Sequence, residues 1–192
     1  MPVNSGPATT WIVAGAPGAG KTTVARVLAG LLDPVPAVLD KDTLFGGLVR
    51  EVLAVNGRQD SEREGPWYDR HVKVHEYGAM TAAAREIRAP GCPVMLVAPF
   101  TGQIRDLRGW SAWVADLGGE PVRLVWVRSD AETLRGRLVS RGRSLDGGKL
   151  DDFDAFVARM RPDTPPPVPH LEIDNRFGAP PLRDQLEAAT LR

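Results

Sequence analysis

The sequence predicts an α/β protein with a five-stranded parallel sheet that has helices on both faces. Short apolar runs alternate with segments of helical periodicity along the chain, which is typical of a parallel sheet. Most positions in these runs are apolar, rather than every second one, as expected of strands that are buried on both faces. The predicted strands are Trp11–Ala14, Ala37–Leu39, Val94–Ala98, Arg123–Val127 and His170–Ile173.

Helices are expected after three of these strands. The first runs from Lys21 to about Leu32, with its apolar residues on one face. After the fourth strand, Ser129 is followed three residues later by Glu132, and this pair predicts a capping box at the start of a helix. The last helix is expected to begin after Pro181.

Length and composition favour one domain of ordinary surface charge. A chain of 192 residues suits a single domain, so we expect residues 1–192 to fold as one unit. The proline-rich run Pro162–Pro169 is then a stiff surface crossing, because the strand and helix after it are too small for a second domain. The formal net charge is zero, so we expect no nucleic-acid partner.

The sequence also bears on where the protein works. No apolar run approaches the roughly 20 residues that a membrane span needs, so we expect no membrane contact. The segment Met1–Ser5 lacks the basic and apolar regions of a signal peptide. We therefore expect a cytoplasmic protein.

One glycine-rich stretch carries the strongest functional signal. It satisfies the phosphate-loop pattern G-x-x-x-x-G-K-[ST] at every fixed position, directly after an apolar run and before a helix-compatible segment. The glycines let backbone N–H groups turn inward around phosphate oxygens, and the helix adds its positive N-terminal end. Lys21 is expected to reach the terminal phosphates, and the Thr22 hydroxyl to bind Mg²⁺. The predicted nucleotide-binding residues here are Gly15, Ala16, Pro17, Gly18, Ala19, Gly20, Lys21, Thr22 and Thr23.

Two carboxylates follow the second predicted strand. Asp40 and Asp42 stand two residues apart where that strand ends, at the edge of the sheet that also carries the phosphate loop. In that position they could serve one metal ion and one hydroxyl group. The alternative is a charged loop in which Asp42 caps a helix that begins near Thr43.

A late segment, residues 134–143, is rich in arginine. Arg137 and Arg141 are four residues apart and therefore share one helix face. Glycines at 142, 147 and 148 are expected to break the helix into a flexible stretch. The alternative is an ordinary solvated helix face.

Together, the phosphate loop, the Asp-x-Asp and the arginine-rich segment resemble the small-molecule kinases of the phosphate-loop class. Shikimate and gluconate kinases, chloramphenicol phosphotransferase and the zeta-type toxins are members, and the overall layout resembles bacterial proteins labelled ATP-binding or AAA family. The likeness covers nearly the whole chain, although only the phosphate loop is specific by itself. It implies strand order 2-3-1-4-5 and the use of ATP and Mg²⁺.

The resemblance also implies roles for individual residues. Asp40 matches the acid that helps to hold Mg²⁺, and Asp42 matches the one that contacts the acceptor hydroxyl and acts as its base. Residues 135–150 match the lid, with Arg137 on the adenine side and Arg141 on the phosphate side. The acceptor-binding region matches residues 43–90. There an aromatic ring could stack on the acceptor and arginines could bind a carboxylate, and we expect Arg50, Tyr68 and Arg70 to contribute.

The predicted function is therefore ATP- and Mg²⁺-dependent transfer of the γ-phosphate to a hydroxyl group of a small molecule, by a monomer or homodimer. Lys21, Asp42 and Arg141 are the predicted catalytic residues. A polynucleotide 5′-hydroxyl kinase is one alternative, although the balanced charge disfavours it. A nucleotide-binding regulatory protein is another, because the third strand ends without the aspartate that many relatives of this class have there.

Overall fold

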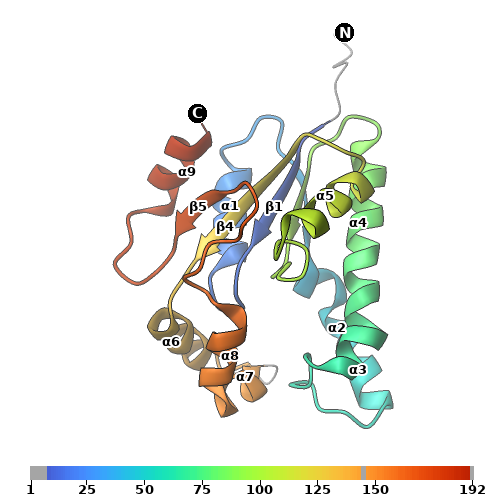
Figure 1. Cartoon of the computed structure of the whole chain (residues 1–192), viewed down its shortest axis with the longest axis vertical. Helices are drawn as coiled ribbons and strands as arrows, with labels where there is room; N and C mark the ends of the chain where they lie inside the picture. Colours follow the sequence, from blue (N-terminus) through green and yellow to red (C-terminus); the bar gives the residue numbers. More distant parts are fainter. Residues whose placement is uncertain (1–7, 144–145, 191–192) are drawn as a thin grey trace.

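The computed structural model describes residues 8–143 and 146–190 and has the predicted fold, a five-stranded parallel sheet with helices on both faces (Figure 1). The strand order is β2-β3-β1-β4-β5, as the resemblance implied, and every pair is parallel. The strands are β1 (Thr10–Ala14), β2 (Ala37–Asp40), β3 (Val94–Val97), β4 (Val122–Arg128) and β5 (Leu171–Asp174). Each lies within one residue of its predicted bounds at either end.

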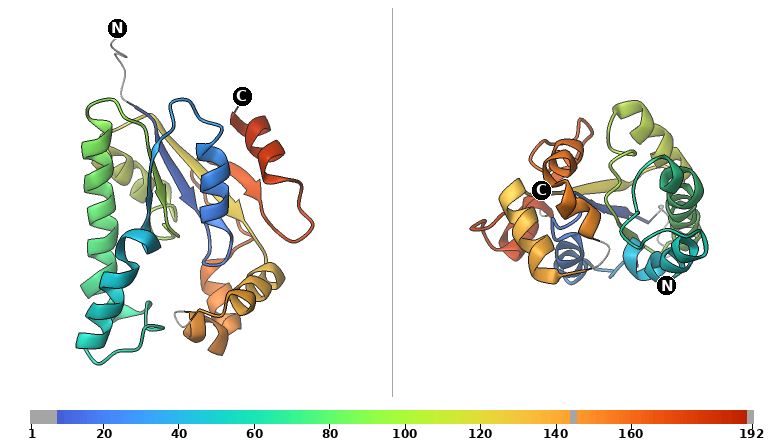
Figure 2. Two further views of the ribbon diagram at one scale, coloured as in Figure 1. Left: turned by 180° about the vertical axis from the view of Figure 1, so that it is seen from behind. Right: turned by 90° about the horizontal axis from the view of Figure 1, so that it is seen from below.

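The helices form two layers around the sheet. The described helices are α1 (Lys21–Ala29), α2 (Lys41–Val55), α3 (Pro66–Tyr68), the π-helical turn η1 (Asp69–Lys73), α4 (Val74–Arg88), α5 (Leu107–Asp116), α6 (Ala131–Arg141), α7 (Gly147–Asp151), α8 (Phe153–Met160) and α9 (Leu182–Thr190). Helices α4 and α5 cover one face, and α1 and α9 cover the other (Figures 1 and 2).

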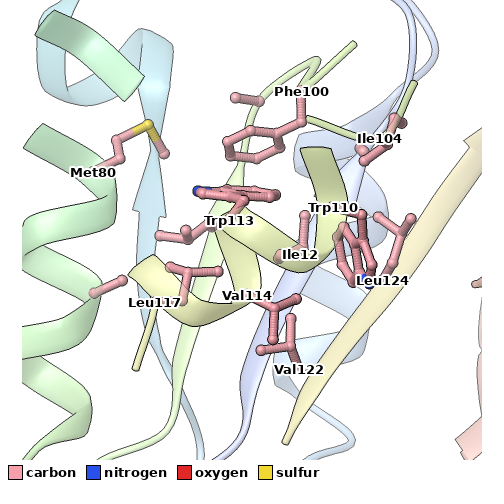
Figure 3. Packing of buried hydrophobic residues seen from close by; sticks show 14 of the residues in the cluster. Ile12, Met80, Phe100, Ile104, Trp110, Trp113, Val114, Leu117, Val122 and Leu124 are labelled. Atoms are coloured by element: carbon pink, nitrogen blue, oxygen red, sulfur yellow. The ribbon is translucent and has the colours of Figure 1, made fainter. Parts of the chain in front are cut away.

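Strand β1 lies at the centre of the sheet and serves both layers. Ile12 and Ala14, two residues apart and on the same face of the strand, belong to the hydrophobic cluster under α4 and α5. Val13, on the opposite face, belongs to the cluster under α1 and α9. Because both faces of the strand are buried, its residues do not alternate between apolar and polar, and this explains the continuous apolar run. Figure 3 shows the first cluster, where Trp113 of α5 stacks against Phe100 with ring centroids 4.8 Å apart.

The structure corrects the predicted start of the helix after β4. Asp130, not Ser129, is the N-cap of α6, since its carboxylate accepts a 2.8 Å hydrogen bond from the Thr133 N–H. Ser129 is fully buried, and its own N–H donates to the Pro162 carbonyl oxygen at 3.0 Å. Asp and Ser are about equally good N-caps. The predicted capping box is therefore wrong, and the helix begins one residue later.

Two further elements differ from the prediction. Helix α1 ends at Ala29, and Gly30 follows it as the C-cap, so the helix is shorter than the predicted span to Leu32. Gly147 and Gly148 open the short helix α7, where a flexible stretch was predicted. The proline-rich run crosses from α8 to β5 without regular structure, as predicted. In the described part of the chain, no helix combines the length and the apolar character needed to cross a membrane.

Candidate active site

A cleft of about 850 Å³ lies at the edge of the sheet where the parallel strands end. Open α/β sheets bind their ligands at this edge. The phosphate loop and the start of α2 form its floor, α3 to α4 with the preceding loop form one wall, and residues of α6, α7 and α8 form the other. Figure 1 shows these two groups of helices on opposite sides below the sheet.

The phosphate loop needs glycine where it meets its neighbours. Gly15 has φ +148°, and a Cβ there would lie 2.7 Å from the carbonyl oxygen of Val127. Gly20, the residue before α1, has φ +90°, and its Cβ would lie 2.2 Å from Nδ2 of Asn175. Only glycine adopts this backbone without strain and tolerates such close packing. The pattern read from the sequence thus has a geometric basis in this chain.

Lys21 is the first residue of α1, and its side chain folds back over the loop. Its Nζ donates a 3.1 Å hydrogen bond to the Ala16 carbonyl oxygen. Burial lowers the pKa of Lys21 to about 8, although the carboxylates of Asp42 and Asp40 act in the opposite direction. The negative charge of these two carboxylates therefore does not make up for the burial of the ammonium group. A triphosphate in the loop would supply further negative charge.

Thr22 and Asp40 form a pair of oxygen donors beside the loop. The Thr22 hydroxyl donates a 2.9 Å hydrogen bond to Asp40 Oδ2. Oxygen ligands of this kind suit Mg²⁺, which usually keeps several waters and takes one or two carboxylates plus phosphate oxygens. No group of three or more His, Cys, Asp or Glu side chains that could hold a metal occurs among the described residues. The residues present therefore fit Mg²⁺ held jointly with a nucleotide rather than by the protein alone.

Asp40 also determines where α2 begins. Its Oδ1 accepts hydrogen bonds from the N–H groups of Asp42 and Thr43 at 3.0 and 3.1 Å, so Asp40 is the N-cap. The alternative in which Asp42 caps a helix that starts near Thr43 is wrong. Helix α2 begins at Lys41, and the Asp42 side chain is left for another role.

Asp42 lies at the edge of the cleft with its side chain 58% exposed. Burial would raise the pKa of its carboxyl, but Lys41 and Lys21 outweigh that effect and hold the pKa below its ordinary value. The carboxylate is therefore ionised at neutral pH and can accept a proton.

A polar network connects Asp42 to α4 and α3. Lys41 Nζ lies 3.4 Å from Asp42 Oδ1 and 2.9 Å from Oε1 of Glu76 on α4, and the Tyr68 hydroxyl donates to Glu76 Oε2 at 2.7 Å.

Arg137 on α6 holds the phosphate loop. Its Nη1 donates to the Ala19 carbonyl oxygen at 3.1 Å, and its Nη2 donates to Asn175 Oδ1 at 3.3 Å. Asn175 Nδ2 donates to the same Ala19 oxygen at 2.7 Å. The guanidinium carbon also lies 5.5 Å from the ring centroid of Phe177. Arg137 therefore connects the loop, α6 and the segment after β5, and its position beside an aromatic ring suits the predicted adenine side.

Arg141 is held by a buried carboxylate. Its Nε and Nη2 donate to Asp146 Oδ2 and Oδ1 at 2.6 and 2.8 Å, and Lys149 Nζ donates to Oδ1 at 2.8 Å. Asp146 is 1% exposed. Arg141 and Arg143 both line the cleft. Residues 144 and 145 of the predicted lid lie outside the described residues.

The structure brings together some of the predicted acceptor residues and not others. Tyr68 lines the cleft beside Asp42, whereas Arg50 and Arg70 are exposed and do not line it. Arg50 lies on α2, with its side chain exposed and its Nε 3.9 Å from Asp60 Oδ2. Sequence reasoning missed Asn175, although it directly follows the end of a strand, where functional residues collect. It also missed Arg63, which stands in a loop without any pattern.

The chain belongs to the AAA domain family, whose model matches residues 11–162. A search of curated proteins found no match. Among solved structures, a candidate kinase from Chloroflexus aurantiacus J-10-fl is 21% identical with a TM-score of 0.66, and the match covers 96% of this chain and 94% of that chain. A sugar kinase from Janibacter sp. HTCC2649 is 17% identical with a TM-score of 0.63, at 96% and 94% coverage. The APS kinase CysC from Mycobacterium tuberculosis, solved with AMPPNP and APS, is 19% identical with a TM-score of 0.57, at 96% and 95% coverage.

These likenesses concern the fold, and they extend over nearly the whole chain. They confirm the predicted resemblance to phosphate-loop kinases of small molecules and the predicted architecture.

Proposed function

We propose that this protein is an ATP- and Mg²⁺-dependent kinase that phosphorylates a hydroxyl group of a small molecule. The observation that carries the proposal is the relation of Lys21 to Asp42. Each lies close enough to the other to shift its pKa, so a phosphate-loop lysine and an ionised carboxylate line the same cleft. That is the pairing needed to bind a terminal phosphate and to deprotonate a hydroxyl beside it.

The proposed reaction assigns one task to each residue. Asp42 accepts the proton of the acceptor hydroxyl while that oxygen forms a bond to the γ-phosphorus. The bond from the γ-phosphorus to the oxygen that bridges it to the β-phosphorus breaks, and ADP leaves. Lys21 and Arg141 donate hydrogen bonds to the charge that spreads over the transferring group. Thr22 and Asp40 would hold Mg²⁺, which neutralises charge on the β- and γ-phosphates when it is bound.

The structural neighbours support this proposal at the level of chemistry. The M. tuberculosis protein is an APS kinase that was solved with the ATP analogue AMPPNP, and the Janibacter protein is a sugar kinase. The phosphate loop of this chain lies at the sheet edge where open α/β sheets bind their ligands. The size of the cleft, about 850 Å³, supports a small-molecule acceptor, since it falls in the range of ordinary ligand sites.

A screen tests the proposal. The purified protein is incubated with ATP and Mg²⁺ and a library of hydroxylated compounds, and mass spectrometry detects products that carry one added phosphoryl group. Short oligonucleotides with a free 5′-hydroxyl belong in the library, because their phosphorylation would favour a polynucleotide kinase instead. We expect transfer to a small molecule and none to the oligonucleotides.

One observation favours a second candidate, a nucleotide-binding regulatory protein. The segment after β3 reads Ala98-Pro99 and brings no carboxylate to the cleft. Tight ATP binding without transfer to any library member would support that candidate. The cytoplasmic location and the oligomeric state stay predictions.

A further inference from the structure

The cleft is far more basic than the chain as a whole. Eleven Lys and Arg side chains and five Asp and Glu side chains line it, whereas the whole chain has a formal net charge of zero. A triphosphate accounts for part of this surplus, but Mg²⁺ neutralises part of the triphosphate in turn. Asp146 and Asp60, which do not line the cleft, compensate part of the rest, and the cations that remain would attract a second negative group.

We propose that the acceptor carries an oxyanion group in addition to the hydroxyl that receives phosphate, and that Arg63 binds this group. The acceptor class is then a hydroxy acid, or a hydroxylated sulfate or phosphate ester. This inference rests on the proposed kinase function, since it assigns the second substrate of the same cleft.

Arg63 is held in place by its own surroundings. Its side chain is only 9% exposed, in the loop that precedes α3. Nε donates to the Asp60 carbonyl oxygen at 3.1 Å and to Asp60 Oδ1 at 3.2 Å. Nη2 donates to the same carboxylate oxygen and to the Gly46 carbonyl oxygen, the latter at 3.4 Å. A planar guanidinium that is fixed in this way loses little entropy when it binds a further oxyanion.

These contacts use only one side of the guanidinium. Within residues 8–143 and 146–190, Nη1 of Arg63 has no hydrogen-bond partner. It is not one of the fully buried polar atoms that lack a partner, so solvent reaches it. Since Arg63 lines the cleft, Nη1 is available to a ligand there. Asp60 does not cancel this charge fully, because it also lies 3.9 Å from the guanidinium of Arg50.

The position of Arg63 relates it to the reacting group. Together with Lys41 and Lys21, it is one of the cations that outweigh burial at Asp42 and lower the pKa of that carboxyl. An oxyanion bound at Arg63 would thus place the rest of a small molecule next to Asp42, where the hydroxyl proton has to go.

Several other cations that line the cleft are paired with carboxylates, as Arg63 is with Asp60. Lys73 Nζ lies 2.9 Å from Asp69 Oδ1, Lys41 pairs with Glu76, and Arg159 pairs with Glu64. The pairs of Lys73 and Arg159 are exposed and contribute little to the recognition of a ligand, whereas Lys41 and Glu76 form a buried pair. Arg63 differs from Lys41 in its planar guanidinium, which is fixed along one side and leaves Nη1 without a hydrogen-bond partner among the described residues.

The first experiment compares acceptors in matched pairs. Hydroxy acids and hydroxylated sulfate and phosphate esters are each assayed beside the uncharged alcohol of the same skeleton, for example glycerate, glycerol phosphate and glycerol. We expect the charged members to be phosphorylated with at least about tenfold higher kcat/KM, since hydrogen bonds to charged groups contribute about 1.5–3 kcal/mol. Preference for the uncharged members would overturn the inference but leave the kinase proposal standing.

The second experiment changes the residue. Arg63→Gln should raise the KM for the charged acceptor by about 10- to 100-fold, the same free energy expressed as a ratio, and leave the KM for ATP unchanged. The control is Arg58→Gln in the same loop, because Arg58 pairs with Glu62, stacks on Trp67 at 4.2 Å and does not line the cleft. We expect the control to behave like the wild type. An unchanged acceptor KM in folded Arg63→Gln would contradict the assignment.

A binding measurement separates this inference from the kinase proposal. The protein is saturated with AMPPNP and Mg²⁺ to fill the phosphate loop, and inorganic sulfate is titrated in by calorimetry. The wild type should bind sulfate at least about tenfold more tightly than Arg63→Gln. If no acceptor is ever phosphorylated, the kinase proposal fails while this titration still decides whether Arg63 binds oxyanions. Equal sulfate affinities would overturn the inference. Should Arg63→Gln fail to fold, Arg63→Lys keeps the charge without the fork, and we expect it to bind sulfate with reduced affinity.

Discussion

The Thr22 hydroxyl donates a 2.9 Å hydrogen bond to Oδ2 of Asp40, and this contact joins the first turn of α1 to the end of β2. The other oxygen of the same carboxylate caps α2, the helix that carries Asp42. One carboxylate therefore fixes the phosphate loop relative to the proposed base. In the proposed reaction, this contact would let the segments after β1 and β2, whose strands are separated in the sheet by β3, act on one phosphoryl group.

Asp40→Asn separates the two tasks of that carboxylate. Asn caps helices about as well as Asp, so we expect the free energy of unfolding to change little. The loss of charge should raise the Mg²⁺ concentration for half-maximal activity by about 10- to 100-fold, the usual effect of changing a group that supports a metal site. Asp40→Ala, as a comparison, should also lose about 1 kcal/mol of stability, because it removes the cap. An unchanged Mg²⁺ requirement in Asp40→Asn would remove Asp40 from the metal site.

Asp42→Asn tests the proposed base. Because Asp42 is not the helix cap, the variant should stay folded, with a small loss of stability at neutral pH because the lowered pKa shows that the fold favours the ionised carboxylate. We expect kcat to fall by about 100- to 10,000-fold, the typical contribution of a general base, with the KM for ATP little changed. Steady-state kinetics with both substrates varied gives both constants. Full activity in a folded Asp42→Asn protein would assign the base elsewhere.

Lys21 makes stability depend on pH in the absence of nucleotide. Burial lowers its pKa from 10.5 to about 8, so between those values the folded protein binds fewer protons than the unfolded chain. The cost of the buried charge is present in full below about pH 8 and is relieved as the pH rises toward 10.5. Lys21→Met should therefore be more stable than the wild type at pH 7, and the difference should shrink above pH 8. Urea unfolding of both proteins at pH 7 and pH 10 measures this, and a difference that stays constant would contradict it.

The two arginines of α6 should differ when each is changed to Ala. Arg141→Ala should lower kcat by about 100- to 1,000-fold, as loss of a donor to transition-state charge does, with a smaller loss of ATP affinity. Arg137→Ala should mainly weaken ATP binding, because Arg137 holds the Ala19 carbonyl oxygen of the phosphate loop and packs on Phe177. Calorimetric ATP binding together with kcat distinguishes the two. If both variants matched the wild type, α6 would have only a structural role.

Much of the fold could be predicted, because its strands are buried on both faces and so are apolar along their whole length. The start of α6 could not be, since Ser129 and Asp130 are both good N-caps and stand side by side. Which of them is buried depends on the Pro162 carbonyl oxygen, from a segment more than thirty residues away. Tertiary contacts of this kind leave no local pattern.

The same reason explains which residues of the candidate site could be predicted from the sequence and which could not. The phosphate loop binds through consecutive backbone groups, so its chemistry is visible in consecutive residues. Arg63, Glu76 and Asn175 reach the cleft from three different elements, and none of them stands in a recognisable motif. Arg50 and Arg70 have side chains suited to a carboxylate and lie in the predicted region, but both are exposed and neither lines the cleft.

The most direct test of the kinase proposal compares the wild type with Lys21→Ala on the best acceptor from the screen. The quantity measured is the rate at which the terminal phosphate of isotopically labelled ATP appears on that acceptor. We expect the wild type to transfer the label and Lys21→Ala to be slower by at least about 100- to 1,000-fold, because the lysine binds charge that develops in the transition state. Equal rates in the two folded proteins, or tight ATP binding by the wild type with no labelled product from any hydroxyl compound, would contradict the proposal.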